Sequence, residues 1–146
     1  MDEGPHHPGP GDPIPGQHRT HPLSPHLQIY RWPITMAASI THRATGIALA
    51  AGTLFLAWWI IAAASGPDAY GAFASAANHP IGIIVLFGFV WSLAFHFLNG
   101  IRHLAWDMGY GFKVPTAKLT AALVFAGSIA IAGGALAVGL MGRIAP

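Results

Sequence analysis

Three long stretches of this sequence contain no Asp, Glu, Lys or Arg: residues 44–67, 69–101 and 119–142. A helix needs about 20 apolar residues, roughly 17–25, to cross the hydrocarbon core of a bilayer. The first and third stretches fit one helix each, and Asn78, His79 and Pro80 divide the second. Pro80 suits a helix start, because its missing N–H would have no partner in a first turn. We therefore predict three transmembrane helices, at about 34–64, 80–106 and 116–142.

The composition excludes most other classes of protein. Only 8% of the residues are charged and 53% are hydrophobic, whereas a soluble domain carries about 25% charged residues. A soluble enzyme domain is therefore excluded, and an all-α membrane protein is expected. The absence of cysteine also excludes a thiolate-bound iron–sulfur cluster, a c-type haem attachment and a disulfide.

Lysine and arginine gather on one side of the predicted helices. Six such residues lie at or before the first helix or around the connection between the second and third: Arg19, Arg31, Arg43, Arg102, Lys113 and Lys118. The opposite side holds Arg143 alone, together with Asp68 in a segment, 65–79, that we expect to be a loop. Regions rich in Lys and Arg stay in the cytoplasm. The N-terminus and the 107–115 loop are therefore expected to be cytoplasmic.

Residues 1–25 differ from the rest of the chain, because Pro, Gly and His dominate them. Such a segment has little apolar surface to bury, so we predict a disordered tail followed by a transmembrane anchor domain over 26–146. The tail resembles neither a secretory signal nor a mitochondrial transit peptide, which favours a bacterial inner membrane. Its histidines could bind a metal, although a plain disordered tail is the simpler interpretation: His6, His7, His18 and His21.

His96 is an ionisable residue near the middle of the second predicted helix. It lies about ten residues, roughly 15 Å, from the cytoplasmic end of that helix. Ionisable groups at this depth are costly, so they suggest a function. The imidazole could be hydrogen-bonded to a neighbouring helix, or it could be an axial ligand to haem iron. Gly100, one turn further on, leaves room for a flat macrocycle beside the helix.

His103 projects from the same face as His96, about 10 Å nearer the cytoplasm. One iron cannot bind both histidines, because two axial ligands must approach from opposite faces of the porphyrin. If His96 binds haem iron, the second ligand is expected from another chain. Arg102 and His103 would then lie where the haem propionates point, although Arg102 could instead be an ordinary snorkelling side chain.

A stripe of polar residues lies near the cytoplasmic end of the first helix. Its members follow helical spacing on one face: Ser39, His42, Arg43 and Gly46. A hydroxyl, an imidazole and a guanidinium together could hold a polar head group such as a quinone while its tail stays in lipid. An interfacial charged patch is the alternative, and it accounts for Arg43 more easily than for Ser39 and His42.

Two segments of the chain resemble a known family. SPHLQIYRWPITMAASITHRATG, residues 24–46, and HFLNGIRHLAWDMGYGF, residues 96–112, are similar to the two motifs of the cytochrome b subunit of succinate dehydrogenase. The resemblance covers about 120 residues. One departure is His21-Pro22, where members commonly have Arg-Pro, and it could weaken a contact with partner subunits.

The resemblance implies a role for each matching residue. His96 matches the axial ligand of haem b, and the companion anchor subunit would provide the second ligand. His42 and His103 match positions near the haem propionates. Ser39 and Arg43 match residues of the ubiquinone site, and Arg43 is expected to serve both groups. Asp107 matches an aspartate near the quinone pocket and the iron–sulfur subunit.

The resemblance also implies a place in a larger assembly. The chain would form half of a heterodimeric anchor helix bundle that docks an iron–sulfur subunit and a flavoprotein, in the respiratory chain and the tricarboxylic acid cycle. It would have no catalytic residues of its own. Three alternatives stay open: an anchor of quinol:fumarate reductase, an anchor that has lost its haem, and a small transporter subunit lined by His42, Arg43 and His103.

Overall fold

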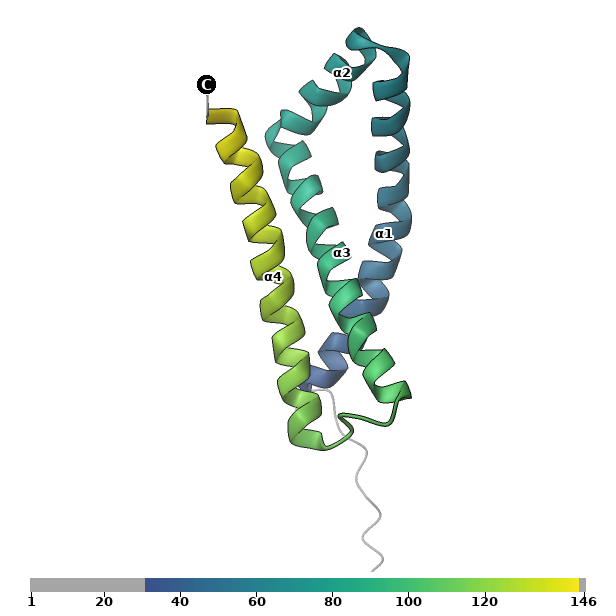
Figure 1. Ribbon diagram of the computed structural model, residues 1–146, viewed down its shortest axis with the longest axis vertical. Helices are drawn as coiled ribbons and strands as arrows, with labels where there is room; N and C mark the ends of the chain where they lie inside the picture. The colour runs from purple at the N-terminus through teal and green to yellow at the C-terminus, as the bar shows by residue number, and fades with distance from the viewer. Residues whose placement is uncertain (1–30, 145–146) are drawn as a thin grey trace, which may run out of the picture. The chain divides into compact units, whose positions relative to one another are not determined.

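The computed structural model describes residues 31–144, and within them the chain forms four α-helices (Figure 1). They are α1 (Ile34–Ser65), α2 (Pro67–Asn78), α3 (Pro80–Asp107) and α4 (Val114–Ile144). The predicted tail and its four histidines lie outside the described residues.

The three predicted long helices are confirmed. Each begins and ends within two residues of the predicted position, and α1, α3 and α4 are long and apolar enough to cross a membrane. Large apolar side chains point outward along them. Ile47 and Leu54 of α1, for example, are 74% and 75% exposed. A soluble protein rarely exposes apolar surface on this scale, so these faces suit a lipid environment.

The prediction of a loop over 65–79 is wrong, because α2 occupies most of that segment. Gly66 has a φ of 107° and turns the chain between α1 and α2, a conformation that glycine adopts at little cost. Pro67 then begins the helix, and Asp68 in the first turn complements the helix dipole. Phe73 and Ala77 are buried against Ala62 of α1. Tertiary packing therefore holds a helix that is too short to form a transmembrane span.

His79 joins α2 to α3. Its backbone ends α2, and its side chain accepts a hydrogen bond from the Ile81 N–H at 3.3 Å. Pro80 then occupies the first position of α3, as the sequence predicts.

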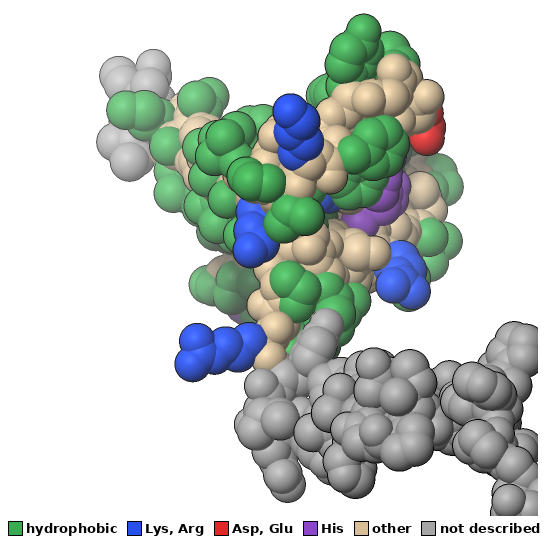
Figure 2. All heavy atoms as spheres, turned by 90° about the horizontal axis from the view of Figure 1, so that it is seen from below, with side chains coloured by type: hydrophobic (Ala, Val, Ile, Leu, Met, Phe, Trp, Pro, Cys, Tyr) green, Lys and Arg blue, Asp and Glu red, His purple; other side chains and the backbone are tan. Residues whose placement is uncertain are grey.

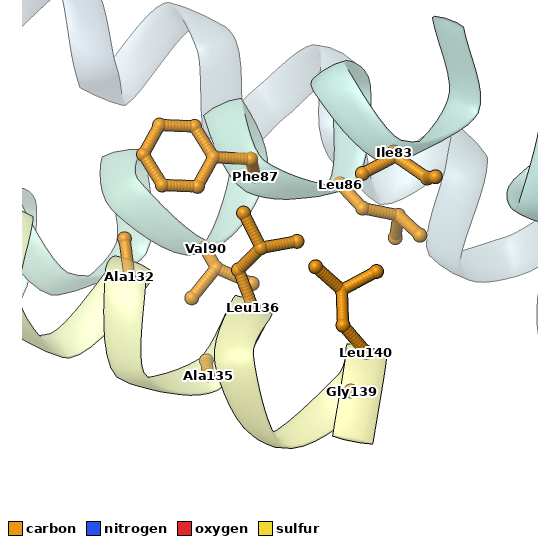
Figure 3. A pocket seen from close by; sticks show the side chains of 9 residues that line it. All are labelled: Ile83, Leu86, Phe87, Val90, Ala132, Ala135, Leu136, Gly139 and Leu140. Atoms are coloured by element: carbon orange, nitrogen blue, oxygen red, sulfur yellow. The ribbon is translucent and has the colours of Figure 1, made fainter. Parts of the chain in front are cut away.

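Helix α3 packs against both α1 and α4. Toward the end where α1 begins and α3 ends, a buried cluster joins these three helices through Ala38, Phe95, Ala121 and Val124. At the other end α1 and α3 diverge, and α2 connects them (Figure 1). The α3–α4 contact there leaves an apolar groove of about 220 Å³, lined by residues such as Phe87, Val90 and Leu136 (Figure 3).

Candidate functional site

Three histidines from two helices come together in the half of the bundle where α1 begins and α3 ends. The ring of His42, on α1, stacks on the ring of His96, on α3, with centroids 3.9 Å apart and 15° between the planes. The ring of His103 lies 5.4 Å from that of His42. Figure 2 shows this end of the bundle, with a histidine visible among Lys and Arg side chains.

The hydrogen bonds of His96 define which of its ring nitrogens carries the proton. Nδ1 lies 3.2 Å from the backbone carbonyl oxygen of His42 and 3.3 Å from Thr45 Oγ1. Because a carbonyl oxygen only accepts, Nδ1 must be the protonated nitrogen. The Thr45 hydroxyl donates to the same carbonyl at 2.9 Å, so its lone pairs are free to accept from Nδ1–H. The Nε2 atom of His96 therefore keeps an available lone pair.

Glycine allows this close approach of α1 to His96. A Cβ atom at Gly46 would lie 3.3 Å from His96 Cε1 and 3.8 Å from Nδ1. Gly46 thus makes room for the imidazole against the backbone of α1. At Gly100, one turn beyond His96, a Cβ atom would meet nothing within 4 Å, so the chain itself leaves this position open.

One buried nitrogen of the site has no partner. His42 Nδ1 is inaccessible and makes no hydrogen bond with any described residue. A buried polar atom without a partner is costly, so a group outside the described residues is expected to satisfy it.

The three histidines do not form a metal site by themselves. In the part of the chain that the structure describes, no three His, Cys, Asp or Glu side chains are arranged to hold a metal ion. The stacked rings of His42 and His96 also cannot approach one iron from opposite sides. Any bis-histidine iron site that uses His96 would therefore need a second ligand from outside residues 31–144.

The predicted quinone residues lie at the same end but remain separate. Ser39, Arg43 and Asp107 are all exposed. Among residues 31–144, no side-chain hydrogen bond or ring contact joins them to one another or to the histidines. The predicted stripe on α1 is thus divided: His42 and Gly46 face His96, while Ser39 and Arg43 face outward.

Arg102 differs from both predictions made for it. The side chain is only 6% exposed, so the snorkelling interpretation is wrong. Its Nε donates to Thr120 Oγ1 at 3.1 Å, and a terminal nitrogen donates to the Ala117 carbonyl at 3.1 Å, both on α4. The other terminal nitrogen donates to Asn99 Oδ1 at 3.3 Å. The guanidinium therefore links α3 to α4 instead of turning toward the three histidines.

Thr45 is the residue of the site that the sequence did not reveal. It is 2% exposed and contacts both His42 and His96. Its position three residues after His42 was the available signal, but threonine is common in apolar helices, and the pairing of α1 with α3 was not known.

Comparisons with known proteins give one consistent family. Residues 17–135 match the family described as succinate dehydrogenase/fumarate reductase transmembrane subunit. The succinate dehydrogenase cytochrome b556 subunit of Paracoccus denitrificans is 41% identical over 111 residues, which cover 76% of this chain and 85% of the relative.

Two further relatives agree. The cytochrome b556 subunit of Rickettsia felis is 40% identical over 99 residues, covering 68% of this chain and 77% of the relative. The mitochondrial cytochrome b560 subunit of Sus scrofa is 45% identical over 96 residues, covering 64% of this chain and 57% of that protein.

Proposed function

This chain belongs to the succinate dehydrogenase/fumarate reductase transmembrane subunit family, as a cytochrome b membrane anchor, and from that premise we propose its ligands and partners. It is a non-catalytic subunit of the succinate:quinone oxidoreductase complex. In our proposal it shares haem b with a second small anchor subunit, docks the iron–sulfur and flavoprotein subunits, and forms part of the ubiquinone-reduction site.

The observation that carries the haem proposal is the hydrogen bond between His96 Nδ1 and the His42 carbonyl. Histidines that bind metals commonly donate their other ring N–H to a carbonyl or carboxylate, which fixes the tautomer and makes the ligating nitrogen more basic. His96 has this arrangement within a transmembrane helix. We therefore propose that its Nε2 atom would bind the haem iron as the ligand that this chain provides.

The surrounding residues fit a haem group. Gly100 leaves an open position one turn from His96, and the buried Nδ1 of His42 lacks a partner. His103 lies seven residues, about 10 Å, nearer the end of α3 than His96, and His42 and His103 would donate hydrogen bonds to the haem propionates. When bound, haem b supplies a one-electron redox centre. The second axial ligand would come from the partner anchor subunit.

The exposed polar residues at the same end suit a quinone head group. Reduction of ubiquinone to ubiquinol consumes two electrons, delivered from succinate by the partner subunits, and two protons. The Arg43 guanidinium would stabilise negative charge that develops on one quinone oxygen. Ser39 would hydrogen-bond the other carbonyl or relay a proton to it. We place Asp107 near this pocket and near the iron–sulfur subunit.

The distribution of charge supports the proposed location. Arg43, Arg102, Lys113 and Lys118 all belong to the end where α1 begins and α4 begins. By the positive-inside rule this end is cytoplasmic. We propose a bacterial inner membrane, with the N-terminus and the docked subunits on the cytoplasmic side, so that protons for the quinone come from that side.

A reduced-minus-oxidised absorption spectrum of the purified complex tests the haem proposal. The wild type is expected to show a b-type band that the His96→Ala variant loses or shifts. His79→Ala is the matched control, because His79 caps the start of α3, roughly 25 Å along the helix from His96. This control should keep the wild-type band.

The result separates the alternatives. A wild-type complex without a b-type band would identify a haem-less anchor and refute the haem proposal. A band that survives in His96→Ala would assign the ligand to another residue. The names of the relatives favour succinate oxidation over fumarate reduction. This direction would be contradicted if the purified complex reduced fumarate with a low-potential quinol faster than it oxidised succinate with ubiquinone.

A further inference from the structure

Arg102 is a buried cation with no carboxylate beside it. Its three hydrogen bonds go to neutral acceptors, the Thr120 hydroxyl, the Ala117 carbonyl and the Asn99 amide oxygen. Its guanidinium carbon lies 4.0 Å from the centroid of the Trp106 ring. Within residues 31–144 no salt bridge reaches it. Because a guanidinium keeps its charge in proteins and a buried, unpaired charge is costly, an anion from outside residues 31–144 is expected here.

A groove beside Arg102 offers the space. It lies between α3 and α4 and has a volume of about 270 Å³. Arg102, Tyr110 and Thr120 are among its lining residues, and most of the wall is apolar, formed by residues such as Leu98, Ile101 and Leu123. The groove thus places a cationic residue beside an apolar wall.

The groove is distinct from the histidine site. Ile101 and Ala105, which line the groove, lie five and nine residues after His96. At 3.6 residues per turn these positions are rotated about 140° and 180° from His96. The groove therefore opens on the opposite face of α3, and a group bound to His96 would not fill it.

The depth of Arg102 suits a lipid head group. It lies five residues before the end of α3, about 7.5 Å along the helix axis, which is the region where phosphate groups meet the hydrocarbon core. The flanking Lys113 and Lys118 are exposed and add positive charge at this end. Basic pockets between transmembrane helices commonly bind anionic head groups.

We propose that this groove binds one phospholipid with an anionic head group. A guanidinium has five N–H donors, and three of those of Arg102 are already used. The two that remain would bind the lipid phosphate, with the Tyr110 hydroxyl as a further donor. One acyl chain follows Leu98, Ile101 and Leu123 toward the bilayer centre. A free phosphate ion would leave this apolar wall uncovered, whereas the acyl chain of a phospholipid covers it. This difference favours a phospholipid over a phosphate ion.

Lipid titration of the purified complex, followed by native mass spectrometry, tests the proposal. The probes are phosphatidylglycerol and phosphatidylcholine with identical acyl chains. The wild type is expected to bind one phosphatidylglycerol about tenfold more tightly than phosphatidylcholine. Arg102→Gln removes the charge, and Ala105→Phe fills the groove without changing Arg102. Each should weaken phosphatidylglycerol binding roughly tenfold to a hundredfold.

Ala135→Phe is the matched control, because Ala135 lines a separate α3–α4 groove, at the far end of the bundle (Figure 3). It should leave phosphatidylglycerol binding unchanged, and the mass of the assembled complex verifies that each variant is intact. If Arg102→Gln fails to assemble, Ala105→Phe alone decides. Equal binding of the two lipids, no bound lipid in the wild type, or wild-type binding in Ala105→Phe would overturn the proposal.

Discussion

Replacing Thr45 by valine removes a hydroxyl from the contact between α1 and α3 while keeping the shape of the side chain. Thr45 is buried, donates to the His42 carbonyl at 2.9 Å and lies 3.3 Å from His96 Nδ1. In the Thr45→Val variant, Nδ1–H keeps only the His42 carbonyl, at 3.2 Å. If His96 binds haem iron, the substitution changes the basicity of the ligating nitrogen through the imidazole ring, while the ligand remains histidine.

The size of the effect follows from the two hydrogen bonds that the hydroxyl makes, one to the His42 carbonyl and one from His96 Nδ1–H. A buried hydrogen bond contributes about 1 kcal/mol net, so the assembled complex should lose about 2 kcal/mol of stability. An acceptor at Nδ1 makes the ligating nitrogen more basic and favours the oxidised iron. Losing this acceptor should therefore raise the haem midpoint potential. If all of the energy of the bond to Nδ1, about 1 kcal/mol, distinguished the two oxidation states, the rise would be about 40 mV, which is an upper limit.

A redox titration of the purified complex, followed at the b-type band, measures this potential. Thr45→Ser is the matched control, because it keeps the hydroxyl and loses only a methyl group, at a cost of about 0.8 kcal/mol in stability. We expect the serine variant to be less stable but to keep the wild-type potential. A valine variant with the wild-type potential, or a serine variant shifted as far as valine, would refute the role given to the hydroxyl.

Two other substitutions test the quinone residues and the fold. Arg43→Ala should retain the b-type spectrum and slow succinate-dependent ubiquinone reduction at least tenfold. Lys118 is another exposed basic residue at the same end, and the Lys118→Ala variant should reduce quinone at the normal rate. Equal rates in the two variants would contradict the role given to Arg43. Gly82→Ala should lower the thermal stability of the complex by about 1–3 kcal/mol, because its Cβ atom would collide with the backbone carbonyl of Ala76 in α2. Gly88→Ala changes the same helix, but nothing lies within 4 Å of the new Cβ atom, so it should be neutral or slightly stabilising. If Gly88→Ala melted at a lower temperature than Gly82→Ala, the packing explanation would be excluded.

The long helices could be predicted because a transmembrane span depends on the composition of one continuous segment of the sequence. A run without charges has few alternatives to a membrane helix, and Pro80 marks a helix start by its own chemistry. Helix α2 was not predicted, because this segment is too short and not apolar enough to span a membrane. It is held by the contacts of Phe73 and Ala77 with other helices, which no local pattern records.

The candidate site shows the same division. Helical spacing correctly placed His96 and His103 on one face of α3, because spacing within a helix is local. The stacking of His42 on His96 depends on how α1 crosses α3, and the hydrogen bond that Thr45 accepts from His96 Nδ1–H depends on the same crossing. Arg102 was misread because its partners, Ala117 and Thr120, belong to another helix. The roles of Ser39, Arg43 and Asp107 stay predictions that rest on the family.

The central claim is that His96 Nε2 binds haem iron, and imidazole rescue of a His96→Gly variant tests it most directly. Glycine leaves a gap in the shape of the lost side chain, and the His42 carbonyl and Thr45 remain to hold an added imidazole by its N–H. We predict that the variant complex lacks the wild-type b-type spectrum and regains it when imidazole is added. A variant that shows the wild-type band without imidazole, or one whose lost band imidazole fails to restore in an intact complex, would contradict the assignment of His96 as the ligand.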